Sequence, residues 1–600
     1  MENKYLMIME VSQKQSYIFN EKKLKNNILA SDTIAYVTSS EFFEKQFADC
    51  YNKDDNMVYS GGGHTYLIFD SRDQARTFAK KVSAYVIREF VGLELFIKIM
   101  PYLPDENADE AEREAFRKMG PVARIKKLTD ELEKKKGRRE ASFFQTTFGV
   151  ENSGRRRSVS DGDSDGNMEK MRDTVRDEVN KASKLMATRC KKDSDPVDVE
   201  NLPAGYEEAK QFSELIGGNS RKNFIAVIHI DGNQMGNRVT ALAKCIEDDT
   251  LKIKDKYKGL SKECQEFEIW RKYSRTFSDS IDYDFKKALE LVYEDVKESL
   301  EDDEHGIGCE FFKDGETKKK FPLRRIITAG DDICFVTDGR IGLECAARFI
   351  EHLEKQENEV DKKNYHACAG VAIVHQKYPF YRAYDMAEQL CANAKKVMME
   401  KRNAYVKAEA EALEKKGMDP EKAKKDAEDK IPVGSLSAID WHIEYGEMVG
   451  SLDDIREKMV TIEGKKPMFA RPYQISDAAQ VHHLEAADNG TEYGYYDFRR
   501  LLLSLLCVSD KSDRSDAGKK KPYIAAFKQS PENLKLDVAR NKQKAMRNAI
   551  KDGKKAYERF ITMNCVSGKL TGFADMHQVF DALEASDLFL PLRKSEKTMI

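Results

Sequence analysis

Two adjacent carboxylates, Asp331 and Asp332, lie in the segment RRIITAGDDICFVT (324–337), between two short apolar runs. The pattern predicts a β-hairpin whose tip carries both acids. Neighbouring like charges repel each other, and a turn needs at most one aspartate. The pair is favourable when a cation binds to it. Mg²⁺ and Mn²⁺ suit this arrangement, because such hard cations bind through one or two carboxylates together with substrate phosphates.

A third carboxylate follows a predicted buried strand, NFIAVIHI (223–230), where Asp231 opens the segment DGNQMG (231–236). We expect this strand to lie beside the hairpin. Asp231, Asp331 and Asp332 then converge on two metal ions that activate a 3′-hydroxyl and stabilise the leaving pyrophosphate.

Small residues and one lysine surround these acids in the sequence. Ala329 and Gly330 would let a phosphate or ribose approach the hairpin, and Gly232 and Gly236 would do so at the strand-to-helix turn. Lys395, on a predicted helix, is placed to reach a triphosphate. Each feature has a structural alternative: a Gly-Asp-Asp or Asp-Gly turn without chemistry, or a surface lysine. The complete order of motifs favours the functional interpretation.

The elements that must position these residues occur twice along the chain. Each copy runs from a strand through helices to a hairpin, then to a helix and a strand, and the first hairpin has the tip Gly61-Gly62-Gly63-His64. Such a repeat predicts two ferredoxin-like modules in an α+β protein. The expected elements are 5–11, 14–48, 57–70, 72–91 and 93–100 in the first copy, and 223–230, 237–300, 324–337, 340–356, 366–374 and 378–398 in the second.

The composition changes along the chain indicate four regions. Residues 1–102 form the first module, 103–222 a charged helical insertion with a mobile loop, 223–430 the second module, and 431–600 a helical C-terminal domain. Within this scheme, 400–430 is a solvated helical connector.

The whole-chain composition excludes several classes. A net charge of −3 gives no global basic field for nucleic acid. The eleven cysteines form no CxxC pair, so neither a zinc ribbon nor a redox motif is indicated. The chain shows no signal-peptide layout and no apolar run of about 18 residues, the length needed to cross a membrane. We therefore expect a soluble cytoplasmic protein.

These motifs resemble the large polymerase/cyclase subunit of type III CRISPR effector complexes, the Cas-ten family, and its Cmr-type members most of all. The similar segments are DGNQMG (231–236), AGDD (329–332), GVAIVHQKYPFYRAYDMAEQLCANAK (370–395), SLSAIDWH (435–442), SQKQSYIFNEKKLKNNILASD (12–32) and SGGGHTYLIF (60–69).

The resemblance implies two facing palm domains, the first degenerate, that together hold two nucleotides. The second palm would join ATP into cyclic oligoadenylate when target RNA is bound. The implied partners are the other subunits of the complex, crRNA and target RNA, and a downstream effector that responds to the product. Asp331 and Asp332 match the family's two adjacent acids, and Asp231 matches the first acid of its other motif.

The chain departs from the family pattern at four points. Ala329 replaces a glycine, and Asn233 replaces an acid and so removes one possible metal ligand. The family's inter-palm cysteine cluster is missing, which predicts no zinc. The chain starts directly in the first palm and has no His-Asp dipeptide, which predicts no nuclease activity of the His-Asp type.

Some nuclease-lacking Cmr-type members join AMP from ATP to S-adenosylmethionine. In that case the first palm, bordered by Gly62 and Gly63, would hold this co-substrate instead of a second ATP. Its ammonium and sulfonium groups favour nearby carboxylates, and Asp70 and Glu151 are the candidates. The alternative for both is an ordinary exposed acid.

Two other classes of function remain open at this stage. In the first, the chain would be a non-catalytic scaffold subunit whose palms only bind nucleotide. In the second, it would be a stand-alone enzyme similar to diguanylate cyclases. The intact acids Asp231, Asp331 and Asp332 argue against the scaffold, and the duplicated palm argues against the stand-alone cyclase.

Overall fold

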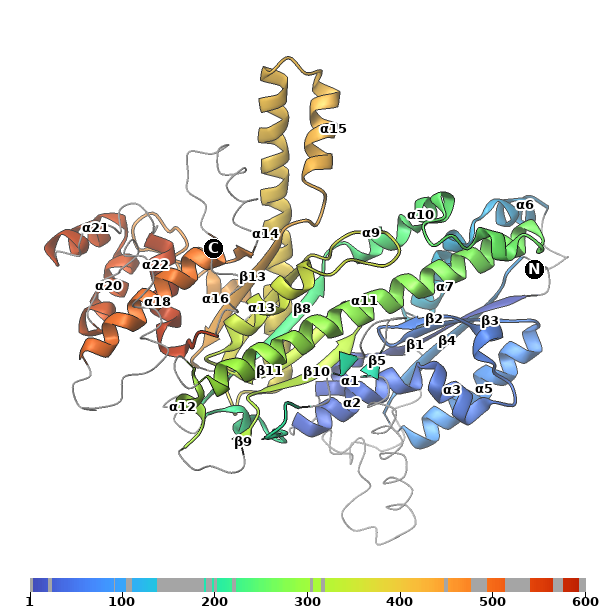
Figure 1. The fold of residues 1–600 in the computed structure, drawn as a ribbon, viewed down its shortest axis with the longest axis horizontal. Helices are drawn as coiled ribbons and strands as arrows, with labels where there is room; N and C mark the ends of the chain where they lie inside the picture. The colour runs from blue at the N-terminus through green and yellow to red at the C-terminus, as the bar shows by residue number, and fades with distance from the viewer. Residues whose placement is uncertain are drawn as a thin grey trace, which may run out of the picture.

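The computed structural model describes residues 4–19, 24–90, 92–103, 110–137, 188–189, 197–198, 202–217, 223–302, 306–313, 319–446, 452–475, 494–512, 540–564 and 576–592. Two sheets lie end to end along its long axis, with the N-terminal module at one end and the C-terminal helices at the other (Figure 1). Within the described residues, no helix is both long enough and apolar enough to cross a membrane.

The N-terminal sheet has four strands in the order β2-β3-β1-β4. All neighbouring strands are antiparallel, and helices separate β1 from β2 and β3 from β4. This is a ferredoxin-like βαββαβ unit. Its elements are β1 (Tyr5–Ser12), α1 (Lys14–Phe19), α2 (Leu24–Val37), α3 (Ser40–Phe47), α4 (Lys53–Asn56), β2 (Met57–Gly61), β3 (His64–Phe69), α5 (Arg72–Glu89) and β4 (Glu94–Pro101).

The second sheet repeats this arrangement and extends it. Its order is β10-β11-β8-β12-β13-β14, and its first four strands match β2-β3-β1-β4 in chain order and direction. The predicted duplication and the α+β class are therefore confirmed. The elements are β8 (Phe224–Gly232), α9 (Met235–Thr240), α10 (Leu242–Asp248), α11 (Lys262–Glu301), α12 (Gly308–Phe311), β10 (Leu323–Ala329), β11 (Asp332–Asp338), α13 (Gly342–Glu354), β12 (Ala367–His375), α14 (Phe380–Lys415), α15 (Pro420–Lys430), β13 (Ser437–Glu444), α16 (Leu452–Arg456) and β14 (Tyr473–Ile475).

The structure corrects two expectations about the C-terminal half. β13 pairs in parallel with β12, and β14 pairs with β13, so the sheet of the second palm continues to residue 475 and the helical region does not start at 431. Residues 400–430 are not a connector. α14 continues to Lys415, and α15 packs back along it as a helical arm that projects from the body (Figure 1).

Short elements complete the described structure. In its described part, the insertion after β4 contributes two α-helices, one 3-10 helix (Phe212–Leu215), one short strand pair and the strand β7, which pairs with β9. The described C-terminal region contributes four α-helices that pack beyond the second sheet (Figure 1). These α-helices and strands are α6 (Glu110–Lys118), α7 (Pro121–Gly137), β5 (Thr188–Arg189), β6 (Val197–Asp198), β7 (Tyr206–Glu207), β9 (Lys319–Lys320), α18 (Tyr495–Ser512), α20 (Arg540–Asp552), α21 (Lys554–Met563) and α22 (Met576–Ala585).

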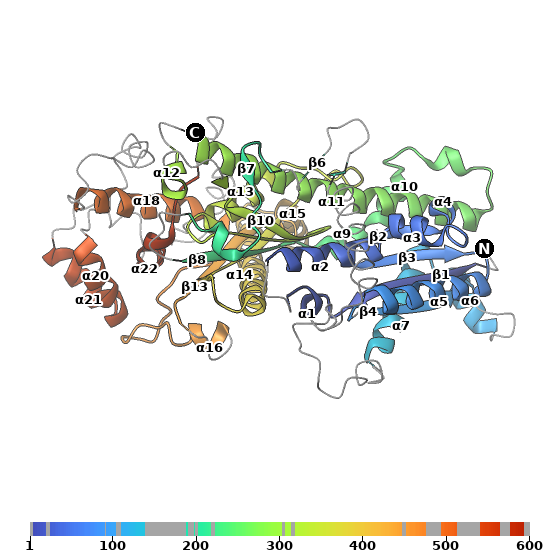
Figure 2. The same ribbon diagram turned by 90° about the horizontal axis from the view of Figure 1, so that it is seen from below.

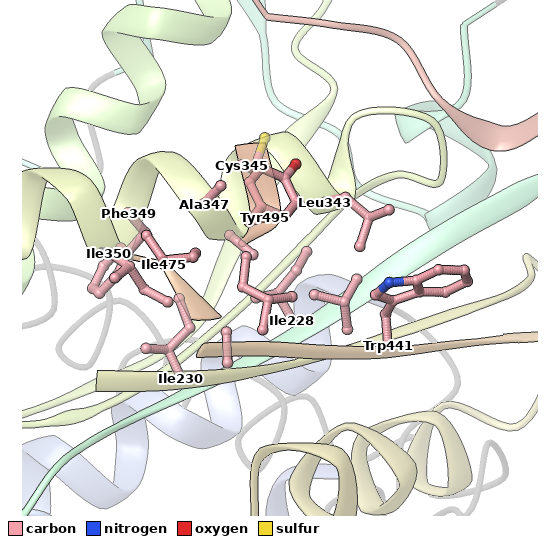
Figure 3. Close-up of a cluster of buried hydrophobic side chains, with 14 of the residues drawn as sticks. Ile228, Ile230, Leu343, Cys345, Ala347, Phe349, Ile350, Trp441, Ile475 and Tyr495 are labelled. Carbon is pink, nitrogen blue, oxygen red and sulfur yellow. The ribbon is translucent and has the colours of Figure 1, made fainter. Parts of the chain in front are cut away.

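The central strand β8 faces two different cores. Ile228 and Ile230 point to the core formed with α13, β13 and the C-terminal helices (Figure 3). The alternate residues Ile225 and Val227 point to a second core, shared with the first palm and α14. Since side chains alternate along a strand, Asp231 lies on the same face as Val227. Its carboxylate is thus directed to the side of α14 and the first palm.

The two palms are packed directly against each other. Phe19 of α1 contacts Phe380 and Tyr384 of α14, with ring centroids 5.4 and 4.2 Å apart. Arg325 of β10 forms an ion pair with Asp32 of α2, and the two side chains are 4% and 13% exposed. Helix α11 runs along both sheets in both views (Figures 1 and 2). The relative position of the palms is therefore fixed by buried contacts.

Candidate active site between the two palms

The carboxylate pair lies at a two-residue hairpin turn, with Asp331 in the turn and Asp332 as the first residue of β11. Ala329 of β10 pairs with Asp332 of β11, which leaves Gly330 and Asp331 as the central residues. Gly330 has φ +70°, a conformation that a glycine adopts without strain and that type II′ turns require at this position. The first palm also has a two-residue turn: Gly61 pairs with His64, and the central residues Gly62 and Gly63 both have positive φ, as in a type I′ turn.

Asp231 and Asp332 are direct cross-strand neighbours between β8 and β11. Directly opposed like charges destabilise a sheet. Burial, followed by the Asp231 charge, raises the pKa of Asp332 to about 7 and that of Asp331 to about 6. The Asp332 side chain is still 44% exposed because it faces a cavity. Nearby positive charge would relieve this repulsion.

Gly232 allows the hairpin tip to approach the end of β8. A Cβ atom at position 232 would lie 3.1 Å from Asp331 Cβ and 3.0 Å from Met235 Cε. Its amide also donates a hydrogen bond to the Asp331 carbonyl oxygen, 3.3 Å away. In contrast, a Cβ at Gly236 would meet no atom within 4 Å. The sequence predicts that both glycines let a ligand approach the backbone. In the structure, Gly232 instead allows close packing against Asp331 and Met235, and the space beside Gly236 is open.

Lys395 of α14 lies at the same edge of the sheet. Its ammonium donates to Asp231 Oδ2 at 2.6 Å and to the Gly232 carbonyl oxygen at 2.9 Å. Its side chain is 29% exposed, so it holds one acid of the set while remaining accessible. The structure therefore brings together Asp231, Asp331, Asp332 and Lys395.

Asn233 has a structural role that sequence reasoning missed. Its side-chain amide donates to the carbonyl oxygens of Gly434 and Leu436, at 3.1 and 3.0 Å. A carboxylate has no proton to donate there. The amide thus ties the strand-to-helix turn to the chain entering β13.

A cavity of about 460 Å³ lies between the two hairpin tips. The first palm lines it with the β1–α1 turn, part of α2 and the Gly61–Gly63 tip, and the second palm lines it with β10, the Ala329–Gly330 turn and Asp332. Gly62 and Gly63 therefore border the cavity. The cavity also contains charged residues that the sequence analysis did not single out: Glu10, Lys14, Asp32, Lys136, Asp282, Lys286 and Arg325.

Glu10 is the counterpart of Asp231 in the first palm. It pairs with His64 across β1 and β3, as Asp231 pairs with Asp332 across β8 and β11. Two lysines surround it: Lys136 Nζ lies 2.7 Å and Lys14 Nζ 3.8 Å from its carboxylate. Lys136 also pairs with Glu133 at 2.7 Å, so the charges of the first tip are balanced where the second tip carries excess negative charge. Only the strand register reveals this equivalence.

The two acids proposed for a cationic co-substrate have different outcomes. Asp70 lies just beyond the far end of β3 from the Gly62–Gly63 turn, is paired with Lys4 at 2.7 Å, and has a 71% exposed side chain. It does not line the cavity, and its suggested role there is wrong. Glu151 lies outside the described residues.

The second-palm carboxylates suit a hard divalent cation. Asp332 Oδ1 is buried without a hydrogen-bond partner in the described structure and lies 3.4 Å from His229 Nδ1. Burial lowers the pKa of His229, which keeps this ring neutral. However, no group of three or more His, Cys, Asp or Glu side chains within the described ranges is already arranged around one point. Substrate phosphates would have to complete the coordination, as is usual for Mg²⁺.

The fold and the site thus define a tandem-palm protein with one acidic hairpin tip. Residues 224–406 match the family model of Cas10/Cmr2, second palm domain. The resemblance drawn from the sequence is confirmed over this segment, which is similar to that domain. No curated protein matches the chain.

Solved structures with a similar chain path include the Csm1–Csm4 cassette in complex with pppApA, at 14% identity and TM-score 0.41, covering 98% of this chain and 69% of that chain. The cassette in complex with cA4 matches at 13% identity and TM-score 0.42, with 98% and 69% coverage. The Csm1–Csm4 subcomplex of the type III-A CRISPR-Csm interference complex matches at 14% identity and TM-score 0.41, with 98% and 70% coverage.

Proposed function

We propose that the cavity between the palms is the active site of a metal-dependent nucleotidyltransferase that uses ATP and works in a type III CRISPR RNA-guided complex. The observation that carries the proposal is the pair of facing tips: Gly61–Gly63 from the first palm and Ala329, Gly330 and Asp332 from the second border one cavity. The Cas10/Cmr2 second palm domain supports the assignment to the complex. Subunits of that complex, crRNA and target RNA are the proposed partners.

The reaction forms a bond between an acceptor hydroxyl oxygen and the α-phosphorus of ATP. The bond from that phosphorus to the bridging oxygen breaks, and pyrophosphate leaves. Asp231, Asp331 and Asp332 would hold Mg²⁺ or Mn²⁺, which neutralises the phosphate charge and lowers the pKa of the hydroxyl. Lys395 would exchange its contact with Asp231 for a phosphate oxygen as ATP binds.

The first palm determines which acceptor is used. Lys14 and Lys136 line the cavity beside Glu10 at the first tip, and these two ammonium groups favour an acceptor with phosphates. A second ATP meets that requirement, and the product is then an oligoadenylate, cyclic if the chain closes on itself. The alternative acceptor is S-adenosylmethionine, whose cationic groups would have to displace a lysine from Glu10. In both cases the product would act on a downstream effector.

Product analysis by mass spectrometry tests this proposal. The assembled complex receives target RNA and Mg²⁺ or Mn²⁺, with ATP alone or with ATP and S-adenosylmethionine. Oligoadenylate from ATP alone, unchanged by the co-substrate, establishes the first product. An adenylated S-adenosylmethionine, with little product from ATP alone, establishes the second.

Matched variants identify the site. We expect Asp331→Ala/Asp332→Ala to abolish the product. The control Glu428→Ala/Asp429→Ala changes an equally acidic adjacent pair that is exposed on α15, far along the sequence from the cavity, and should retain wild-type activity. No product from the wild-type complex with RNA confirmed bound would contradict the proposal and favour a nucleotide-binding scaffold.

A further inference from the structure

One face of α11 touches both hairpins. Five polar residues recur along it at intervals of four, three, four and four positions, the spacing of residues on one helical face. We call them the α11 stripe: Arg271, Arg275, Ser278, Asp282 and Lys286. The last three line the cavity between the palms.

The first two residues of the stripe form hydrogen bonds with the strand that leads to the Gly61–Gly63 tip. Arg271 Nε donates to the Met57 carbonyl oxygen at 2.7 Å, and Arg275 Nε donates to the Val58 carbonyl oxygen at 3.0 Å. Arg271 also donates to the Asp54 carbonyl oxygen. Guanidinium groups are charged donors, so these are strong hydrogen bonds to the backbone of α4 and β2.

The middle of the stripe contacts the two tips one after the other. A Cβ atom at Gly61 would lie 3.4 Å from Ser278 Oγ, so this serine packs on the first tip. Four residues later, Asp282 Oδ1 accepts a hydrogen bond from the Gly330 amide at 3.4 Å. With a rise of 1.5 Å per residue, the two contact points lie about 6 Å apart along the helix axis.

Lys286 orients the carboxylate that binds the catalytic turn. Its ammonium lies 3.0 Å from Asp282 Oδ2, and the two side chains are only 5% and 13% exposed. Gly330 is a central residue of its turn, so the β10–β11 ladder does not use its amide. Asp282 therefore supplies a partner for this amide and fixes the turn relative to α11.

We propose that α11 sets the spacing of the two palm tips and that Asp282, held by Lys286, is a positioning residue for the turn that carries Asp331 and Asp332. Asp282 acts through the Gly330 amide and takes no part in bond formation. The catalytic consequence rests on the proposed function, but the structural one does not. The turn should be held by Asp282 even without nucleotide or metal.

The first measurement is hydrogen–deuterium exchange of the full-length chain in a metal chelator. Asp282→Ala should speed exchange in the peptide containing Gly330 by about 3- to 10-fold, the factor for losing one hydrogen bond. Asp282→Asn preserves the side-chain volume and an acceptor oxygen, and should give an intermediate rate. Glu298→Gln, on an exposed acid of the same helix, is the matched control and should leave this peptide unchanged.

The second measurement is steady-state kinetics of the assembled complex. We expect Asp282→Ala to lower kcat by about 10- to 100-fold, because a misplacement of about 1 Å costs about 100-fold. KM for ATP should change by less than about threefold, because Asp282 does not hold the donor nucleotide. Asp282→Asn should restore part of kcat, and a residue that only maintained the fold would not give this kcat-specific pattern.

The two assays separate the possible failures. Wild-type exchange in the Gly330 peptide of Asp282→Ala overturns the inference, whatever the activity. If Asp282→Ala speeds exchange in the full-length chain but the wild-type complex makes no product, the proposed function is overturned and the positioning of the turn is supported. Faster exchange with unchanged kcat refutes the catalytic consequence. If Asp282→Ala does not fold, Asp282→Asn alone decides between these outcomes.

Discussion

Restoring an acid at position 233 should damage the protein. Asn233→Asp replaces an amide that donates to Gly434 and Leu436 with a carboxylate that can only repel those two carbonyl oxygens. Leu436 is buried, and leaving its carbonyl unpaired costs about 1–3 kcal/mol. Gly434 is only partly buried, so its carbonyl can bind water and the loss of its hydrogen bond adds about 1 kcal/mol. We expect a total destabilisation of about 2–4 kcal/mol.

Thermal unfolding of the metal-free protein measures this effect. A loss of about 2–4 kcal/mol lowers the unfolding midpoint by about 4–16 °C for a cooperative unit of about 200 residues. Asn233→Ala removes the same two hydrogen bonds without adding a charge, and the difference between the two variants isolates the electrostatic part. Asn237→Asp, on an exposed residue of α9, controls for a general effect of negative charge near this turn.

The opposite result would support a different view of the site. If Asn233→Asp unfolds within 1 °C of the wild type and turns over faster at low Mg²⁺, the residue is a missing metal ligand and the amide contacts are unimportant. The structure predicts lower stability and no gain in activity at any Mg²⁺ concentration.

Two further predictions concern the interface of the palms and the first tip. Arg325→Gln should destabilise the protein by about 3–5 kcal/mol because it leaves Asp32 buried without its partner. In equilibrium denaturation, the double variant with Asp32→Asn should recover much of that loss. Additive losses from the two substitutions would contradict this prediction. Burial, with Lys14 and Lys136 nearby, lowers the pKa of His64 to about 4, so the unfolded chain binds more protons between about pH 4 and 6.5. Stability should therefore fall as the pH drops through this window, and His64→Gln should flatten the pH profile of the unfolding midpoint; an unchanged profile would show that other groups dominate.

The duplication and the hairpin tips could be predicted because their signals are local. Alternating apolar runs and glycines specify each hairpin, and the order of elements repeats along the chain. β13 was missed for a physical reason. Its buried residues include Asp440, which accepts hydrogen bonds from Arg456 at 2.7 Å and Asn393 at 2.7 Å. A strand with an internal charge does not look buried until its distant partners are known.

Long-range pairing also explains what the site prediction lacked. Asp70 follows a strand that begins at the tip, yet the antiparallel direction of β3 carries it to the opposite end. Asp282 lies 48 residues before the amide it binds. In the sequence of α11 it looks like any other charged residue on the face of a helix. Neither relation follows from spacing along the chain. Both follow at once from the register of the strands and the path of α11.

The register also explains how one fold can provide two unlike half-sites. At equivalent positions the second palm has Asp231 and Asp332, whereas the first has Glu10 and His64. Asp231 is matched by one lysine, so the second tip keeps a net negative charge that attracts a cation. Glu10 is matched by Lys14 and Lys136, and Lys136 also pairs with Glu133, so the first tip has no net negative charge for a divalent ion and offers two ammonium groups to a phosphate. A substrate pair bound between the tips would therefore have one orientation, with the metal-bound phosphate at the second palm and the acceptor at the first.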